Sequence, residues 1–390
     1  GILAVGGNVI KVGVLPTPAI AFLTKRYGAD AGIVISASHN SFEYNGIKFF
    51  NGDGYKLDDL LEEKIEDLIL SSVDVNSHIT GDLIGKCLEA EENARALYEQ
   101  HLLETVDYRL DGKKIVLDCA NGAAYLAAPR VYRELGAEVI VLSDEPNGVN
   151  INENCGSTHP ERMAAKVRET GADLGLAFDG DADRLIVCDN LGRIVDGDKT
   201  IAICARMLKR EGRLAENKVT ATVMSNIGFH KAMEAAGIDV DVTGVGDRYV
   251  LERMLETGCV LGGEQSGHII FREFATTGDG TLSSLQFVKA VLEDGRAVSE
   301  IADEIRIYPQ VLVNAKINND YKKTYSKDAE VAAAIQALES KMQGNGRVLI
   351  RPSGTEPLIR VMAEGDDSGK IERIAEETAE KLARQLDSYN

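Results

Sequence analysis

The 390-residue sequence has few of the features that mark membrane, secreted or zinc-binding proteins. No apolar run approaches the ~18 residues that a membrane-spanning helix needs, and no charged-then-apolar leader precedes a small-residue cleavage site. Its six cysteines stand singly without a Cys-x-x-Cys pair, which argues against a zinc site and against a disulfide framework. We therefore expect a soluble, cytoplasmic protein with no membrane partner.

Positive charge is also scarce in this sequence. Lys and Arg number 43 against 62 Asp and Glu, so the formal net charge is −19. The phosphate backbone of a nucleic acid needs a basic face, so this balance argues against a nucleic-acid partner. It leaves small phosphate ligands open, because a few cations gathered in one site dominate the local potential.

The sequence does contain enough apolar residues, 44%, and enough length for two to four domains. A strand, a small polar loop and a helix follow one another three times, with loops at Ser36, Asn121 and Asn226, and this rhythm predicts parallel strands with right-handed crossovers. From Tyr308 the pattern changes to strands and helices of a smaller α+β domain. We expect an α/β, multi-domain protein with three similar mixed-sheet α/β domains and a C-terminal α+β domain, at residues 1–95, 96–195, 196–307 and 308–390.

A small polar loop follows the predicted strand Gly32–Ile35. It contains Ser38 and His39, and Lys48 lies on the next predicted strand, Ile47–Phe50. A hydroxyl nucleophile, a group that moves its proton and a cation are what a covalent phosphoryl-transfer site requires. An ordinary turn between two strands is the alternative interpretation.

A helix is predicted before this loop. Thr17 and Pro18 make a suitable N-cap and first-turn pair, and the helical pattern continues to Tyr27, just before Gly28. We expect Thr17 to cap this helix.

The segment D-G-D-A-D-R is the strongest local signal for a metal ion. Asp179, Asp181 and Asp183 stand at alternate positions, so their carboxylates can converge on one hard cation. An EF-hand is excluded, because Arg184 stands where that loop needs Gly and Asn190 stands where it needs Glu. The pattern favours Mg²⁺ with coordination positions left for a phosphate oxygen, and a solvated acidic turn is the alternative.

Two further loops offer ligand-binding groups. The Gly-rich turn at 262–268 contains Glu264, Gln265 and Ser266, which suit the hydroxyl or amino groups of a sugar, although a plain hairpin turn fits equally well. Near the C-terminus, a Gly turn with two hydroxyls and two arginines predicts a phosphate-binding nest. Its residues are Arg351, Ser353, Gly354, Thr355 and Arg360.

Together these four loops resemble the α-D-phosphohexomutase superfamily across essentially the whole chain. S-A-S-H-N resembles its phosphoserine loop, D-G-D-A-D-R its metal loop, G-E-Q-S-G-H its sugar loop and R-P-S-G-T-E-P its phosphate loop, in the expected order. Gln265 and the segments 155–161 and 245–250 are similar to the bacterial branch that acts on glucosamine phosphate. The branch that acts on mannose and glucose phosphates usually has Met in place of this Gln.

The resemblance implies four domains around a central active-site cleft, each presenting one loop to it. It implies reversible conversion of glucosamine 6-phosphate to glucosamine 1-phosphate through phosphorylated Ser38 and a 1,6-bisphosphate, upstream of UDP-N-acetylglucosamine. It further implies one Mg²⁺ per active site, glucosamine or glucose 1,6-bisphosphate as activator, and a hexosamine phosphate as partner, and a homodimer is compatible with it. Activity on mannose or glucose phosphates, or a sugar-phosphate-binding protein impaired in catalysis, are the alternatives.

The resemblance also implies a role for each loop. Ser38, His39, Lys48 and Arg184 would be catalytic, and Asp179, Asp181 and Asp183 would hold Mg²⁺ together with the phosphate on Ser38. Sugar binding would fall to Glu264, Gln265 and Ser266, and binding of the phosphate that does not react to Arg351, Ser353, Gly354, Thr355 and Arg360.

The sequence departs from the family pattern in two places. The family loop continues with Pro after Asn40, whereas this chain has Ser41, so we expect a less rigid loop. Family members also have an N-terminal segment with a G-T-D-G-V-R-G-type motif that nothing here matches, so we expect an N-terminal piece to be absent from this sequence.

Overall fold

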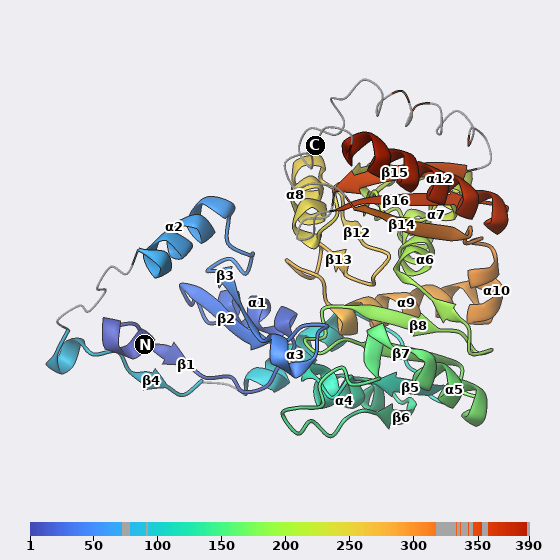
Figure 1. The fold of residues 1–390 in the computed structure, drawn as a ribbon. Coiled ribbons are helices and arrows are strands. Elements are labelled where there is room, and N and C mark those ends of the chain that lie inside the picture. The colour runs from blue at the N-terminus through green and yellow to red at the C-terminus, as the bar shows by residue number, and fades with distance from the viewer. Residues whose placement is uncertain are drawn as a thin grey trace. The chain divides into compact units, whose positions relative to one another are not determined.

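The computed structural model describes residues 1–71, 79–90, 93–316, 333, 336, 342, 346–352 and 358–387. The chain divides into two compact units, which are described separately (Figure 1). The larger unit comprises residues 1–222 and 238–304, and the smaller comprises 223–237 and 305–390. The multi-domain α/β organisation expected from the sequence is confirmed.

The serine loop lies in the first part of the larger unit. It connects β2 (Ala31–Ser36) to β3 (Gly46–Asn51), which pair antiparallel with Ser36 opposite Gly46. Helix α1 (Thr17–Arg26) packs on β2. The other elements here are the parallel pair β1 (Val9–Ile10) and β4 (Cys87–Leu88), with α2 (Asp59–Leu70), η1 (Ile2–Val5), η2 (Phe42–Tyr44) and η3 (Gly81–Leu83).

A five-stranded mixed sheet in the order β6-β5-β7-β8-β9 carries the acidic loop. As the strand–helix rhythm predicts, β5 pairs in parallel with β6 and with β7, whereas β8 pairs antiparallel with β7 and β9. Helix α5 (Glu161–Thr170) buries Met163 and Val167 against this sheet. The strands are β5 (Lys114–Asp118), β6 (Glu138–Leu142), β7 (Leu174–Phe178), β8 (Leu185–Cys188) and β9 (Ile194–Val195).

A four-stranded sheet in the order β11-β10-β12-β13 carries the expected sugar loop. β10 pairs in parallel with β11 and β12, and β12 pairs antiparallel with β13, so residues 264–268 form the turn of a hairpin. Val250 and Met254 of α8 (Asp247–Thr257) pack against this sheet. The strands are β10 (Lys218–Thr222), β11 (Asp239–Thr243), β12 (Leu261–Gly263) and β13 (Ile269–Phe271).

Helix α9 (Gly280–Asp294) is the structural link between these sheets. It contacts β7, β8 and β13, and the backbone N–H of Gly280 at its start donates to the carbonyl of Ala182 in the acidic loop (2.9 Å). The remaining helical elements of the larger unit are α3 (Ala94–Glu104), η4 (Ala123–Tyr125), α4 (Ala127–Glu134), η5 (Gly156–Thr158), α6 (Gly197–Arg210), η6 (Ala215–Asn217) and α10 (Val298–Asp303).

The smaller unit contains an antiparallel sheet in the order β14-β16-β15. Its strands are β14 (Gln310–Lys316), β15 (Gly346–Pro352) and β16 (Leu358–Gly365), and α12 (Ser368–Asp387) packs on β14 and β16. Helix α7 (Ile227–Ala235) joins this unit through the fully buried Glu364, whose carboxylate accepts hydrogen bonds from Arg347 (2.6 Å), the N–H of Ile227 (3.1 Å) and the amide of Asn226 (3.3 Å).

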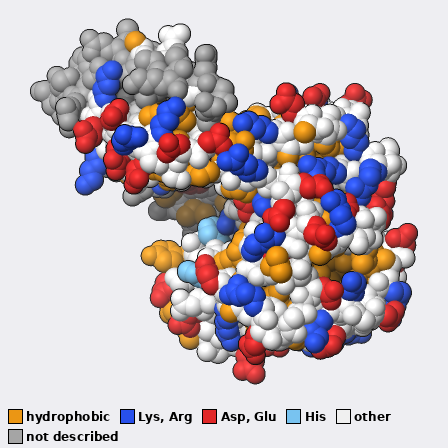
Figure 2. Space-filling model, turned by 90° about the vertical axis from the view of Figure 1, so that its right-hand side faces the viewer, with side chains coloured by type: hydrophobic (Ala, Val, Ile, Leu, Met, Phe, Trp, Pro, Cys, Tyr) orange, Lys and Arg blue, Asp and Glu red, His pale blue; other side chains and the backbone are white. Residues whose placement is uncertain are grey.

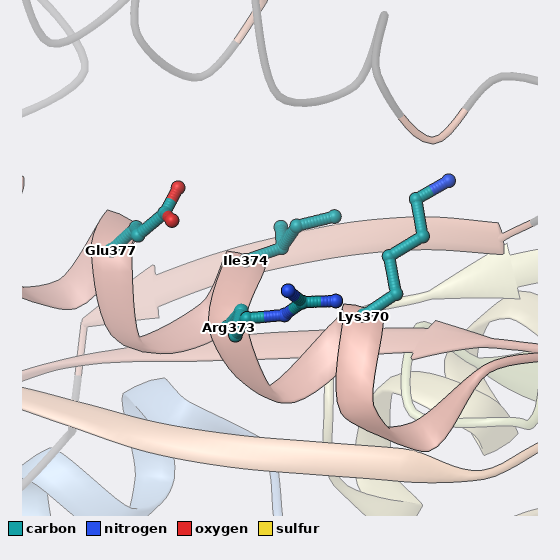
Figure 3. Close-up of a pocket in the computed structure, with 4 residues that line it drawn as sticks. All are labelled: Lys370, Arg373, Ile374 and Glu377. Carbon is teal, nitrogen blue, oxygen red and sulfur yellow. The ribbon is translucent and has the colours of Figure 1, made fainter.

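The described surface gives little indication of a site by itself. On the face seen in Figure 2, Lys and Arg side chains are interspersed with Asp and Glu. Among the described residues, a hollow on α12 is lined by Lys370, Arg373, Ile374 and Glu377 of that one helix (Figure 3). No helix among the described residues is both long and apolar enough to span a membrane.

Candidate active site

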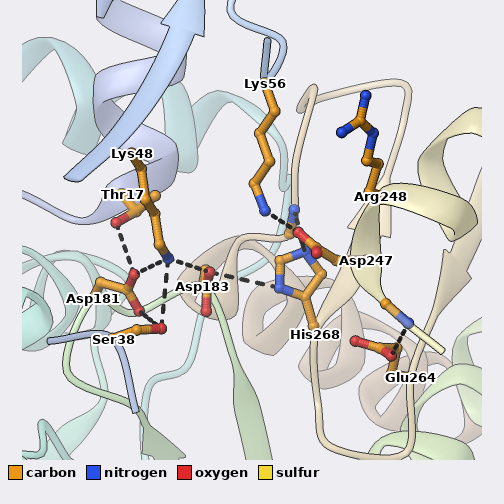
Figure 4. A network of polar contacts seen from close by, with 12 residues as sticks. Thr17, Ser38, Lys48, Lys56, Asp181, Asp183, Asp247, Arg248, Glu264 and His268 are labelled. Atoms are coloured by element: carbon orange, nitrogen blue, oxygen red, sulfur yellow. Dashed lines mark hydrogen bonds and ion pairs between the residues drawn. The ribbon is translucent and has the colours of Figure 1, made fainter. Parts of the chain in front are cut away.

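Ser38 lies in the loop between β2 and β3, in the left-handed backbone conformation (φ 55°). Its N–H donates to the hydroxyl of Ser36 (3.0 Å). Its own Oγ lies 3.3 Å from Oδ1 of Asp181 and 3.5 Å from Nζ of Lys48 (Figure 4). Nδ1 of His39 lies 3.4 Å from the same oxygen. The structure therefore brings a hydroxyl, an imidazole and an ammonium group together with the acidic loop.

The acidic loop is a tight turn between β7 and β8. Asp179, Asp181 and Asp183 are all buried, and their ligand atoms lie within 4.8 Å of one another. A Cβ at Gly180 would lie 2.5 Å from the carbonyl oxygen of Ser38, so only glycine permits this approach of the two loops. The sequence pattern predicted the cluster of carboxylates, and the structure adds the contact of its glycine with the serine loop.

The pKa values of Asp179 and Asp183 are shifted in opposite directions. Burial, with the neighbouring charges of Asp183 and Asp181, raises the pKa of Asp179 well above its usual value. Burial also disfavours ionised Asp183, but the imidazole of His268 and the Lys48 ammonium hold its pKa well below the usual range. Lys48 contacts Asp181 through a hydrogen bond and Asp183 at 3.4 Å, so one cation serves two carboxylates.

The carboxylates offer unused ligand atoms. Oδ2 of Asp179 and Oδ1 of Asp183 are buried, and neither has a hydrogen-bond partner in the described part of the chain. Buried carboxylate oxygens without a partner are costly, and hard divalent cations are bound by oxygen ligands of this kind. The residues present therefore fit Mg²⁺.

Thr17 is a neighbour of this cluster that the sequence did not reveal. Its hydroxyl donates to Oδ2 of Asp181 (3.1 Å), and its N–H donates to the carbonyl of Asp181 (2.9 Å). The expectation that Thr17 caps α1 is wrong, because Pro16 occupies the N-cap position and no side chain caps the helix. Thr17 and Asp181 are far apart in the sequence, so no local pattern could have indicated their contact.

His268 is a second such neighbour. It is buried, with Nδ1 3.7 Å from Oδ2 of Asp183 and Nε2 3.6 Å from Oδ2 of Asp247, which also binds Lys56. Burial opposes protonation of this imidazole, but the Asp183 carboxylate outweighs it and raises the pKa of His268. The sequence motif contained this histidine, yet only the fold places it beside the acidic loop.

The three residues expected to bind the sugar differ in their contacts and in their exposure. Glu264 is half-buried and its Oε1 accepts from the N–H of Gly246 (3.1 Å). The amide of Gln265 donates to Oδ2 of Asp196 (3.2 Å), the N-cap of α6, while Ser266 is exposed.

Arg184 and His39 complete the expected catalytic group. The N–H of Arg184 donates to Oδ1 of Asp179 (3.0 Å), and its backbone forms a bridge with His268. Burial, with the Arg184 charge as the second cause, lowers the pKa of His39. Both residues border the cluster of carboxylates.

The loop expected to bind phosphate lies in the part of the chain assigned to the smaller unit. Arg351 and Arg360 are directly opposite one another on β15 and β16, and burial together with the Arg360 charge lowers the pKa of Arg351. Like charges on paired strands are unfavourable by themselves, which suits a place where an anion binds. Ser353, Gly354 and Thr355 lie outside the described residues.

Comparison with known proteins identifies the family. Four profiles described as phosphoglucomutase/phosphomannomutase match in succession: alpha/beta/alpha domain I at residues 1–74, domain II at 96–192, domain III at 196–308 and the C-terminal domain at 312–381. The chain belongs to the phosphoglucomutase/phosphomannomutase family.

Within the phosphoglucomutase/phosphomannomutase family, the chain is similar to curated phosphoglucosamine mutases of bacteria. That of Alkaliphilus metalliredigens (strain QYMF) is 53% identical over 386 residues, which cover 99% of this chain and 86% of the relative. That of Thermoanaerobacter sp. (strain X514) is 54% identical over the same shares. The resemblance inferred from the sequence motifs is therefore confirmed.

Solved structures share the fold of this chain. A family protein from Burkholderia thailandensis has a TM-score of 0.77 at 23% identity, covering 98% of this chain and 84% of that one. The N-acetylphosphoglucosamine mutase of Aspergillus fumigatus, in complex with GlcNAc-6P and magnesium, has a TM-score of 0.70 at 18% identity, covering 95% and 92%.

Proposed function

We propose that this chain is an isomerase that interconverts glucosamine 6-phosphate and glucosamine 1-phosphate by way of a phosphoryl group on Ser38. Its similarity to phosphoglucosamine mutases supports the substrate. The observation that carries the chemistry is the position of the Ser38 hydroxyl, 3.3 Å from Asp181 and 3.5 Å from the Lys48 ammonium.

In the proposed reaction, the bond between phosphorus and the Ser38 oxygen breaks while a bond to the free sugar hydroxyl forms, which gives a 1,6-bisphosphate. Transfer of the other phosphate back to Ser38 completes the isomerisation. The proton of the attacking hydroxyl needs an acceptor, and His39 and Lys48 lie beside Oγ of Ser38. Burial opposes the charge on Lys48, but Asp183 and Asp181 raise its pKa, so Lys48 stays an ammonium. We therefore assign the proton to His39, whose pKa burial lowers.

Charge develops on the phosphoryl oxygens during transfer. Mg²⁺ bound by Asp179, Asp181 and Asp183, together with the phosphate on Ser38, would withdraw some of this charge. Lys48, and Arg184 at the edge of the cluster, supply fixed positive charge that needs no reorganisation at the moment of transfer. Thr17 holds the Asp181 carboxylate through its hydroxyl.

We assign substrate recognition to the two remaining loops. Glu264 and Ser266 are proposed to face the hydroxyl and amino groups of the sugar, with Gln265 holding the loop on Asp196. The phosphate that does not react is proposed to bind the C-terminal loop, at Arg351, Ser353, Gly354, Thr355 and Arg360. The domains proposed to carry the four loops remain 1–95, 96–195, 196–307 and 308–390.

Three further proposals concern the working enzyme. Glucosamine or glucose 1,6-bisphosphate would activate it by phosphorylating Ser38 again whenever the bisphosphate escapes. A charged hexosamine phosphate does not cross membranes unaided, which supports a cytoplasmic location. We also propose a homodimer, which measurement of the molecular mass in solution would test.

The experiment that tests the function is a mutase assay with Mg²⁺ and glucose 1,6-bisphosphate on the 6-phosphates of glucosamine, glucose and mannose. We expect the highest kcat/KM with glucosamine 6-phosphate. A higher value with glucose or mannose 6-phosphate would favour the alternative mutase activity. Binding without turnover of any of the three would indicate a sugar-phosphate-binding protein.

A further inference from the structure

A residue outside the four loops holds the serine loop in place. The side-chain amide of Asn152 donates one hydrogen bond to the carbonyl of Ser38 (2.9 Å) and another to the carbonyl of Asn40 (2.7 Å). These carbonyls belong to the Ser38–His39 and Asn40–Ser41 peptides. Two carbonyl acceptors at these distances require the NH₂ group of the amide, so the orientation of the Asn152 side chain is fixed by its neighbours.

Asn152 is itself rigidly placed. It is buried, with 7% of its surface exposed, and has the left-handed conformation (φ 58°) that asparagine tolerates better than most residues. Its N–H donates to the carbonyl of Ala120 (2.9 Å), and the amide of Asn121 donates to the carbonyl of Asn150 (3.2 Å). The donor that reaches the serine loop therefore comes from a well-braced segment after β6.

The amide serves the serine loop more than it serves the core. Oδ1 of Asn152 is buried and has no hydrogen-bond partner in the described part of the chain, so burying this side chain carries a cost. Among the described residues, the side chain offsets this cost only through the two hydrogen bonds that it donates to the serine loop. Such an imbalance is typical of a residue kept for geometry at a reactive site.

The serine loop needs an external support. Ser38 has φ 55°, a strained conformation for a residue with a side chain, and that conformation directs Oγ toward Asp181. Ser41, the N-cap of η2, has φ −70°, and its side chain does not restrict the backbone as a proline ring would. Fixing the carbonyls of Ser38 and Asn40 limits rotation of the Ser38–His39 and Asn40–Ser41 peptides.

We propose that Asn152 is a positioning residue for phosphoryl transfer, which holds the loop so that Oγ of Ser38 stays aligned with the acidic loop. This inference rests on the proposed role of Ser38. Because Asn152 touches the loop backbone and no group assigned to the substrate, its loss should slow transfer and leave substrate binding unchanged.

The test uses Asn152→Gly, which removes the amide and accepts the left-handed conformation without strain. The matched control is Asn154→Gly, because Asn154 lies in the same segment with φ 52° and is exposed. We expect Asn152→Gly to lower kcat about 10- to 100-fold, as a small misplacement of reacting groups does, with KM within about twofold of the wild type. Asn154→Gly should match the wild type in both constants.

A rescue separates positioning from general damage. Proline prefers φ near −65°, close to the φ −70° of Ser41, and the N–H of Ser41 meets no acceptor in the described part of the chain. Ser41→Pro added to Asn152→Gly should therefore recover part of the lost kcat. Should Asn152→Gly fail to fold, Asn152→Asp tests the same positioning role. It keeps the size of the side chain and replaces its two N–H donors by an acceptor.

The possible results are distinguishable. If the wild type is active and Asn152→Gly has the same kcat, the positioning role is overturned. A rise in KM alone, or an equal loss of kcat in Asn154→Gly, would also overturn it. A wild type that neither turns over nor carries phosphate on Ser38 would instead refute the proposed function.

Discussion

Asp181 is contacted by residues from distant parts of the sequence. Thr17 and Ser38 approach its two carboxylate oxygens, and Lys48 binds it as well (Figure 4). At the scale of single residues, the Asp181 carboxylate therefore links the acidic loop to the proposed nucleophile and to a cation.

Asp181→Asn should weaken Mg²⁺ binding and lower turnover by about two orders of magnitude or more, since one lost charge-stabilising contact costs about 3 kcal/mol. The free energy of unfolding should hardly fall, because replacing one of three crowded carboxylates relieves repulsion. Calorimetric titration with Mg²⁺ and an assay over a range of Mg²⁺ concentrations measure both effects. Unchanged metal affinity in this variant would exclude the acidic loop as the metal site.

At the scale of elements, α9 begins at a buried N-cap, Asp279. Its carboxylate accepts from the N–H of Leu282 (2.9 Å) and from the hydroxyl of Tyr98 (2.8 Å). Burial raises the pKa of Asp279 to about 6 despite these bonds. The Asp279 carboxylate thus binds a proton more tightly in the folded protein than in the unfolded chain.

Because the folded-state pKa is raised, the wild type should lose stability as the pH rises from about 4 to about 6, by up to about 3 kcal/mol for this group. Asp279→Asn keeps a cap acceptor and does not titrate, so it should lack this loss. Urea unfolding of both proteins at several pH values measures the difference. Parallel pH profiles for the two proteins would show that Asp279 does not titrate in this range.

The sequence analysis predicted the strands of the serine loop but not helix α9. The predicted strands Gly32–Ile35 and Ile47–Phe50 lie within β2 and β3, because each is a short run rich in apolar residues beside a polar loop. Helix α9 buries Thr281, Ser283, Ser284 and Gln286 together with its apolar residues, so its first turns lack the exposed polar face by which an amphipathic helix is recognised. Its environment is set by other elements.

The same limit applies to the site. Ser38 and the three aspartates were recognisable because each lies in a short motif with a chemical meaning. Thr17, Asn152 and His268 were not assigned, because their roles depend on contacts between segments that are far apart in the sequence. Motifs indicated the reacting groups, and only the fold indicated what holds them.

At the scale of the whole molecule, the two recognition loops should have different tasks. Phosphate is common to all hexose phosphates, so Arg351→Ala should raise KM for every substrate alike. A carboxylate gains a charge-assisted hydrogen bond from a protonated amine that a hydroxyl provides only weakly. Glu264→Gln should therefore cost roughly 1 to 2 kcal/mol more with glucosamine 6-phosphate than with glucose 6-phosphate.

Measurement of kcat/KM for both sugars in both variants checks this division. Equal losses on the two sugars in Glu264→Gln, together with a lower Tm, would show that Glu264 only supports the hairpin through Gly246. A sugar-dependent loss in Arg351→Ala would contradict the assignment of the two loops.

Phosphate on Ser38 is the feature on which the proposed function depends. The direct measurement is intact-mass and peptide mass spectrometry after incubation with glucose 1,6-bisphosphate, for the wild type, Ser38→Ala and Ser36→Ala. We expect one phosphoryl group on the Ser38 peptide of the wild type and of Ser36→Ala, its loss to glucosamine 6-phosphate, and neither phosphate nor turnover in Ser38→Ala. Turnover by Ser38→Ala at a near-normal rate, or phosphate on Ser36 instead, would contradict the role of Ser38.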